Sequence, residues 1–214
     1  MRAKLLACVW VCWAEMASAG GLQSLDWFLK TVRSGEAEFE QVVTLPAKPG
    51  QAARRKLSGG TFAFARPGRF RFAYEQPFVQ TLVADGRTLW FFDAELNQVT
   101  ARPQAAALQA TPVALVAGAR DVAALQADFV LRDAPDQDGL QWVLATPKSK
   151  DSALQQVRLG FAAPPAPPLL QVLALTDSLG QESVLRLRNM RVNPSLPASL
   201  FEFSPPPGAE LIRP

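Results

Sequence analysis

Histidine is absent from the 214-residue sequence, and cysteine occurs only at Cys8 and Cys12. Without histidine the chain has no Ser-His-Asp or Cys-His catalytic system, no imidazole general base and no histidine-containing zinc site. Long apolar runs are also missing, because no segment approaches the about 18 apolar residues of a transmembrane helix. What is present is a globular composition, with 49% hydrophobic and 19% charged residues, which excludes a disordered chain.

The first 19 residues have the layout of a secretory signal peptide. Arg2 and Lys4 provide a positive start, residues 5–13 an apolar run, and residues 17–19 a small-residue cleavage site. A short core helix is the alternative. Cleavage after Ala19 removes both cysteines and leaves residues 20–214 as one domain with a net charge of about +2. We therefore expect a soluble, exported protein without disulfides.

Basic residues give no sign of a nucleic-acid partner. Arg54, Arg55 and Lys56 form the only basic run, and such a run between two strands is typical of a solvated loop. A net charge of +3 for the whole chain is far from the basic footprint of a nucleic-acid-binding domain.

Helices are predicted at only a few places. Leu25, Phe28, Leu29 and Val32 follow helical spacing within residues 22–32, and Gly35 is expected to end that helix. A threonine followed by proline opens a second helix over residues 111–117. An aspartate at position 121 caps a third over residues 122–126.

Short strands with alternating apolar and polar residues fill the rest of the chain. We predict them at residues 37–45, 56–65, 69–74, 81–84, 87–92, 97–102, 129–132, 140–146, 154–161, 169–176 and 183–192. So many antiparallel strands must curl, close or split into two layers. The few helices then cover one mouth or face of a curved sheet.

Catalytic signals are weak. Carboxylates gather within residues 85–95 and 133–138, but both groups lie in predicted turns, where acidic residues usually serve as solvated turn formers. The second group also lacks the spacing of a calcium loop. We therefore predict no enzyme, no metal site and no cofactor.

Aromatic stripes are the distinctive feature. Rings alternate along residues 62–64, 70–74 and 90–92, so each stripe lies on one face of its strand. An ordinary sandwich core explains this pattern, and so does an apolar ligand cavity walled by the sheet and roofed by helices. Spacing alone leaves both open.

An ordered series of short motifs carries a family resemblance. FAFARPGRFRF occupies residues 62–72, QP residues 76–77, LVADGRTLWFFD residues 82–93, NQV residues 97–99 and TP residues 111–112. FEQ at residues 39–41 and FEFSPPPG at residues 201–208 complete it. Together these resemble the LolA family, the periplasmic carriers that move lipoproteins to the outer membrane.

The resemblance implies a mainly β fold with a few helices (α+β), in which an unclosed antiparallel β-barrel of about 11 strands holds a helical lid over an apolar cavity. It further implies a monomeric periplasmic carrier of acylated lipoproteins. The carrier receives them from an inner-membrane ATP-driven transporter and passes them to an outer-membrane receptor. The alternative is a lipocalin-like binder, or an enzyme, acting on free fatty acids or other small hydrophobic ligands.

Site residues follow from the stripes and from this resemblance. We expect the cavity wall to contain Phe62, Phe64, Phe70, Phe72, Tyr74, Leu82, Trp90 and Phe92. A one-residue slip in any strand would move its whole set to the other face. Arg66 matches a family arginine that hydrogen-bonds the lid backbone and holds the empty cavity closed.

Overall fold

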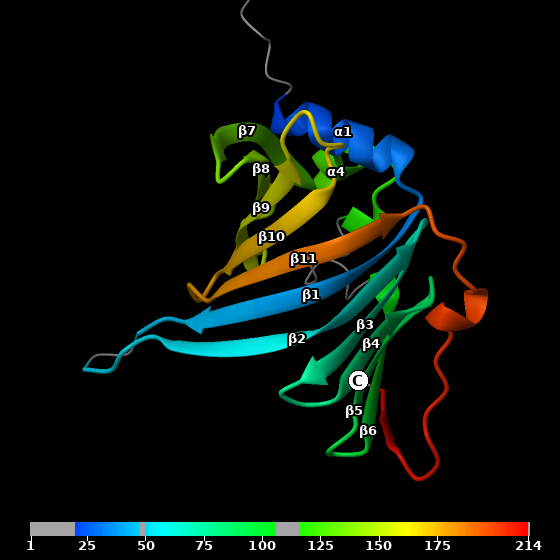
Figure 1. The fold of residues 1–214 in the computed structure, drawn as a ribbon. Helices are drawn as coiled ribbons and strands as arrows, with labels where there is room; N and C mark the ends of the chain where they lie inside the picture. Colours follow the sequence, from blue (N-terminus) through cyan, green and yellow to red (C-terminus); the bar gives the residue numbers. More distant parts are fainter. Residues whose placement is uncertain (1–19, 48–49, 106–115, 214) are drawn as a thin grey trace, which may run out of the picture.

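A computed structural model describes residues 20–47, 50–105 and 116–213. The predicted leader and most of the helix predicted at residues 111–117 lie outside the described residues. The elements follow one another as α1 Gly21–Thr31, β1 Ser34–Leu45, β2 Arg54–Ala65, β3 Arg69–Gln76, β4 Gln80–Ala84, β5 Thr88–Asp93, β6 Gln98–Pro103, α4 Val122–Asp128, β7 Phe129–Gln137, β8 Leu140–Pro147, β9 Leu154–Ala162, β10 Leu170–Asp177, β11 Glu182–Val192, η1 Ala198–Phe201 and β12 Glu210–Ile212 (Figure 1).

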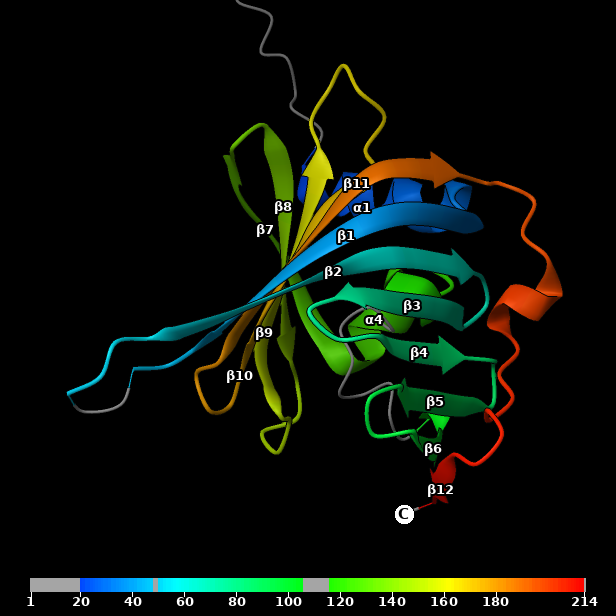
Figure 2. The same cartoon turned by 60° about the horizontal axis from the view of Figure 1, so that its bottom comes forward.

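All strands of the described residues belong to one sheet of twelve strands, in the order β12-β6-β5-β4-β3-β2-β1-β11-β10-β9-β8-β7. The two edge strands, β12 and β7, do not pair with each other, so the sheet is curved but unclosed (Figure 2). This confirms the predicted architecture. Strand β12 escaped prediction because its three residues pair in parallel with β6 and carry no pattern of their own.

Helix α1 lies on the concave face of the sheet, against β7, β8 and β9 (Figure 1). Its predicted apolar stripe is confirmed, because Leu25, Phe28 and Leu29 are fully buried. Ser24 on the same face donates a buried hydrogen bond of 2.6 Å to Gln141 of β8. The stripe therefore directs α1 onto the sheet, and one polar pair sets its position there.

The end of α1 differs from the prediction. The helix stops at Thr31, Val32 is already extended, and Gly35 lies inside β1 instead of ending the helix. A side chain at Gly35 would meet the ring of Phe64 at 2.5 Å. Glycine is needed there for close strand packing and not as a helix cap. The short helix predicted after Asp121 is confirmed as α4, and the Asp121 carboxylate accepts the Ala124 N–H at 2.8 Å.

The C-terminal segment packs on the convex face of the sheet. Phe201 of η1 is buried there with Ala63 and Ala65 of β2, and the guanidinium of Arg69 lies 5.5 Å from the centre of its ring. The two faces of the sheet are thus covered by different parts of the chain, helices on the concave side and the C-terminal segment on the convex side.

Gly60 offers a test of this packing. The ladder between β2 and β3 has an irregularity at residues 59 and 60, and a Cβ atom at Gly60 would overlap the carbonyl oxygen of Ala73. We predict that Gly60→Ala lowers the free energy of unfolding by about 1–3 kcal/mol, because the β3 backbone must shift. Urea unfolding measures this change. Gly118→Ala is the control, since a Cβ there meets nothing within 4 Å, and an equal effect of both substitutions would contradict the explanation.

Candidate functional site

The concave face carries a cluster of aromatic rings from β1, β2 and β3. Phe62 stacks on Phe72 with ring centroids 4.5 Å apart, and Phe39 meets the edges of Phe72 and Tyr74 at 5.2 and 5.0 Å. Phe64 continues the cluster 5.7 Å from Phe62. Five of the residues predicted for the cavity wall, together with Leu82, which packs against the buried cluster, therefore share this face. Those five are Phe62, Phe64, Phe70, Phe72 and Tyr74.

Strand register places Trp90 and Phe92 on the other face. Paired residues of an antiparallel ladder point to the same side of the sheet. Phe72 pairs with Leu82, and Leu82 pairs with Phe91. Phe91 therefore faces the concave side, and its neighbours Trp90 and Phe92 face the convex side. The sequence predicts that Trp90 and Phe92 belong to the same cavity wall as Leu82, and the register contradicts this by placing them on the opposite face.

Contacts on the convex face explain this arrangement. Trp90 and Phe92 both lie against Phe203 of the C-terminal segment, with centroids 5.6 and 6.1 Å away. The indole Nε1 of Trp90 donates to the Asp85 carboxylate at 2.9 Å. Leu89 packs instead against the concave cluster. Because residues 89–92 are all apolar, the strand has no alternation from which its parity could be predicted.

Arg66 joins two parts of the lid, a name we use for α1, residues 116–119 and α4. Its Nε donates to the carbonyl of Val32 at 2.8 Å, and its Nη1 to the carbonyl of Ala119 at 2.6 Å. Val32 is the C-cap of α1, where helix carbonyls lack partners within the helix. The nearby Gly68 N–H also donates to the Ala117 carbonyl at 3.1 Å. The turn between β2 and β3 therefore holds the lid through backbone acceptors.

The Arg66 guanidinium is enclosed by apolar groups. It lies 5.8 Å from the ring centre of Phe28 and 5.6 Å from that of Phe64. Burial, and secondarily the charge of Arg33, lower the pKa of Arg66 to about 10, so the group stays charged at neutral pH. Within the described residues its Nη2 is buried without a hydrogen-bond partner. We call this end of the interior the latch end. It is held by the Arg66 guanidinium, which uses two of its three nitrogens in the hydrogen bonds described above.

Protein side chains fill the interior at the latch end. Phe28 of α1 packs 6.3 Å from Phe64 and 5.8 Å from Phe161 of β9. All three rings are almost completely buried. A ligand that reaches this depth must displace α1 from the sheet.

The opposite end of the concave face is more open. A groove of about 360 Å³ lies there, lined by residues of β1, β10 and β11 and by Leu154 of β9. Leu154 belongs to the buried cluster and Leu175 packs against it, so the groove continues the apolar interior. We call this the mouth groove. Its residues Gln41 and Ser183 were not predicted, although Gln41 interrupts the apolar face of β1 and was a visible signal.

Exposed apolar side chains are found at this end of the sheet. Among the described residues, five large apolar side chains are more than half exposed, and they lie in turns or near strand ends there. They are Leu57, Phe78, Val79, Leu96 and Leu179. The pairings of Gly59 with Gln76 and of Thr44 with Glu182 place these segments at the same end of the sheet, away from Arg66.

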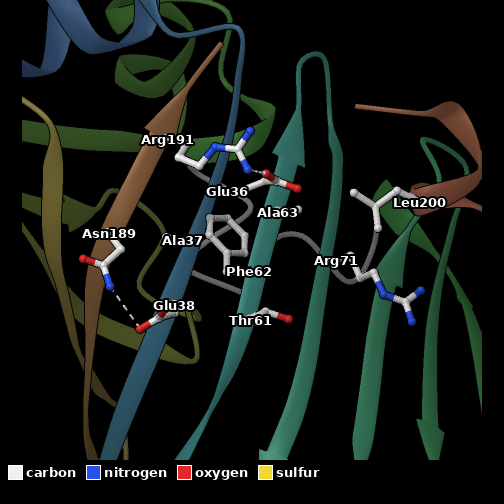
Figure 3. A pocket seen from close by; sticks show the side chains of 10 residues that line it. All are labelled: Glu36, Ala37, Glu38, Thr61, Phe62, Ala63, Arg71, Asn189, Arg191 and Leu200. Atoms are coloured by element: carbon white, nitrogen blue, oxygen red, sulfur yellow. Dashed lines mark hydrogen bonds and ion pairs between the residues drawn. The ribbon is translucent and has the colours of Figure 1, made fainter. Parts of the chain in front are cut away.

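A second groove, of about 420 Å³, lies on the convex face between β11, β1 and β2 and beside Leu200 of η1 (Figure 3). An ion pair and a hydrogen bond line it: Arg191 and Glu36 are 3.1 Å apart, and the Asn189 amide donates to the Glu38 carboxylate at 3.2 Å. This polar groove differs from the apolar site that the sequence predicts.

Two other kinds of site are absent from residues 20–47, 50–105 and 116–213. No three His, Cys, Asp or Glu side chains in these ranges are grouped so that they could hold a metal ion. No helix there is long and apolar enough to cross a membrane.

Comparison with known proteins adds to this geometry. Residues 30–204 match the profile of the family described as outer membrane lipoprotein carrier protein LolA. The chain belongs to the LolA family. The LolA assignment agrees with the unclosed sheet of the described residues.

Curated relatives share the family across nearly the whole chain. An outer-membrane lipoprotein carrier protein of Albidiferax ferrireducens is 58% identical over 201 residues, 94% of each chain. One from Methylibium petroleiphilum is 42% identical over 93% of this chain and 92% of its own length. A solved structure, an uncharacterized conserved protein of Thermus thermophilus, covers 90% of this chain and 97% of its own with a TM-score of 0.53. At 11% identity that likeness concerns the fold alone.

Asp85 gives a test of the convex-face arrangement. Burial works to raise its pKa, but hydrogen bonds from Thr88, Trp90 and Arg87, with the Arg87 charge, lower it below the ordinary value. A carboxylate with a depressed folded pKa stabilises the fold above the unfolded pKa of about 3.9 and loses that effect as pH falls through the folded value.

We predict that Asp85→Asn lowers the free energy of unfolding at pH 7 by on the order of 1 kcal/mol, a figure reduced for solvent screening. The difference from the unmodified protein should shrink as the pH falls below about 5, because the carboxylate becomes protonated first in the unfolded state and then, at lower pH, in the folded state, where its pKa is lowered. Urea unfolding across this range measures it. Asp136→Asn, at an exposed position of β7, is the control, and a pH-independent difference would argue against the role of the Asp85 charge.

Proposed function

We propose that this protein shelters the acyl chains of lipoproteins against its concave face and carries them through the periplasm. In this proposal it receives them from an inner-membrane ATP-driven transporter, passes them to an outer-membrane receptor and catalyses no reaction. The observation that carries the proposal is an aromatic concave face with a mouth groove at one end and an arginine-held lid at the other. Membership of the LolA family supports it.

The energetics favour such a carrier. Burying one methylene group is worth about 0.8 kcal/mol, so a 16-carbon chain exposed to water costs on the order of 12 kcal/mol. The two hydrogen bonds from Arg66 to lid carbonyls contribute about 1.5–3 kcal/mol each. Acyl chains can therefore displace the lid, while the bonds that re-form when they leave favour release.

The open end is the proposed place of exchange. Exposed apolar side chains at this end of the sheet, such as Phe78 and Leu179, offer surface that a transporter or receptor can cover. Acyl chains that pass there move from one apolar environment to another with little contact with water.

Isolation of the loaded protein tests the proposal directly. Protein recovered from the periplasm under mild conditions is expected to retain intact acylated proteins, identified by mass spectrometry. Stoichiometric free fatty acid without any lipoprotein would contradict the carrier function and favour a small-ligand binder.

Arg66 is expected to control release. We predict that Arg66→Leu folds and accepts cargo but transfers it to the receptor at least about tenfold more slowly, because the lid loses two charged hydrogen bonds that favour the empty state. Transfer from preloaded protein to immobilised receptor gives the rate. Arg69→Leu is the matched control, since Arg69 lies over Phe201 on the convex side. Equal rates for the Arg66 variant and the unmodified protein would exclude this role.

Neighbouring positions in β5 test which face meets the cargo. We predict that a photoreactive phenylalanine derivative at position 91 labels the acyl chains of bound lipoprotein, because Phe91 pairs with Leu82 of the concave face. The same group at position 92 should label them at least several-fold less, since Phe92 packs on Phe203. Labelling that is stronger from position 92 would place the cargo on the convex face.

A further inference from the structure

Three polar side chains form a directed chain of hydrogen bonds across the concave face, between the aromatic cluster and the mouth groove. The Tyr74 hydroxyl donates to Oε1 of Gln41 at 3.1 Å. Nε2 of Gln41 then donates to the Ser183 hydroxyl at 2.9 Å. The chain runs from β3 over β1 to β11, and its last two members line the mouth groove.

Ser183 ends this chain with an unused donor. Its oxygen accepts the bond from Gln41, so its own hydrogen remains available. Within the described part of the chain no acceptor receives that hydrogen, although the Ser183 side chain is only 5% exposed. A buried hydroxyl without a protein acceptor is costly, so a ligand that brings an acceptor into the groove gains a hydrogen bond there.

The surroundings restrict what that acceptor is. Leu154, Leu175 and Val43 give the groove apolar walls. The one carboxylate in its lining, Asp177, accepts the N–H groups of Leu179 and Gln181 within its own turn. This carboxylate would repel a negatively charged ligand. A neutral oxygen attached to an apolar chain fits this combination of walls and donor. The groove volume of about 360 Å³ lies in the range of small-ligand sites.

We propose that Ser183, supported by Gln41, binds the carbonyl oxygen of an acyl ester or amide at the point where hydrocarbon chain meets head group. This inference rests on the proposed carrier function and adds to it a polar subsite that fixes how far the anchor enters. The hydrocarbon continues past Gln41 toward the aromatic cluster, and the head group stays at the open end. Lipoprotein anchors and free glycerolipids both contain such carbonyls.

Ligands with and without the carbonyl test the subsite. The probes are a synthetic diacylglyceryl lipopeptide, its dialkyl ether analogue of equal chain length, and a diacylglycerol with its own ether analogue. We expect the protein to bind each ester about three- to tenfold more tightly than the matching ether, because the ether leaves the Ser183 donor unsatisfied. An ester preference with the lipopeptide alone identifies the lipoprotein anchor as the ligand, and a preference with both identifies the acyl ester of any source.

Two substitutions connect the preference to the subsite. Ser183→Ala is expected to abolish the difference between ester and ether while changing ether affinity less than about twofold, and Gln41→Leu to reduce the difference. Thr61→Val, beside the convex groove, should leave it unchanged, and urea unfolding checks that each variant is folded. An ester preference that persists in Ser183→Ala, or its absence from the unmodified protein, overturns the proposal. Failure to bind either lipopeptide would instead refute the carrier function.

Discussion

An unclosed sheet with one aromatic face needs a cover, and this requirement organises the molecule. The twelve strands do not form a closed ring of hydrogen bonds, so the rings on their concave side cannot be shielded by the sheet alone. Helix α1 provides part of the cover through Leu25 and Phe28. The contact between α1 and the sheet is apolar along most of its length. It is therefore strong in water, but another apolar surface can replace α1 there.

In the function that we propose, Arg66 decides the competition between the closed lid and a bound hydrocarbon chain. A lid held only by apolar contacts would have no preference for its own position over that of a bound hydrocarbon. Two hydrogen bonds from Arg66 to backbone carbonyls stabilise the closed lid. These bonds depend on direction and form only when the lid is closed. Their acceptors are main-chain atoms, so the latch needs no acidic partner, and a pKa of about 10 keeps the arginine charged at neutral pH.

Local patterns predicted most elements because each depends on a few adjacent residues. Alternating rings placed Phe70 and Phe72 on one face, and Asp121 capped α4 as expected. The prediction failed where the local pattern carries no information. The apolar run 89–92 has no alternation, so the face on which Trp90 lies depended on its contact with Phe203, more than a hundred residues away. The position of Gly35 depended likewise on the ring of Phe64 opposite it.

The sequence by itself determined the class of the protein: many short strands, one amphipathic helix, a single composition throughout and a series of motifs typical of the LolA family. Only the tertiary structure decided which apolar residues face the interior and which polar ones join them. Gln41 and Ser183 are 142 positions apart in sequence and meet because β1 pairs with β11. The face on which a side chain lies, and contacts such as that between Gln41 and Ser183, arise from pairing between strands that are distant in sequence. The spacing of neighbouring residues does not contain that information.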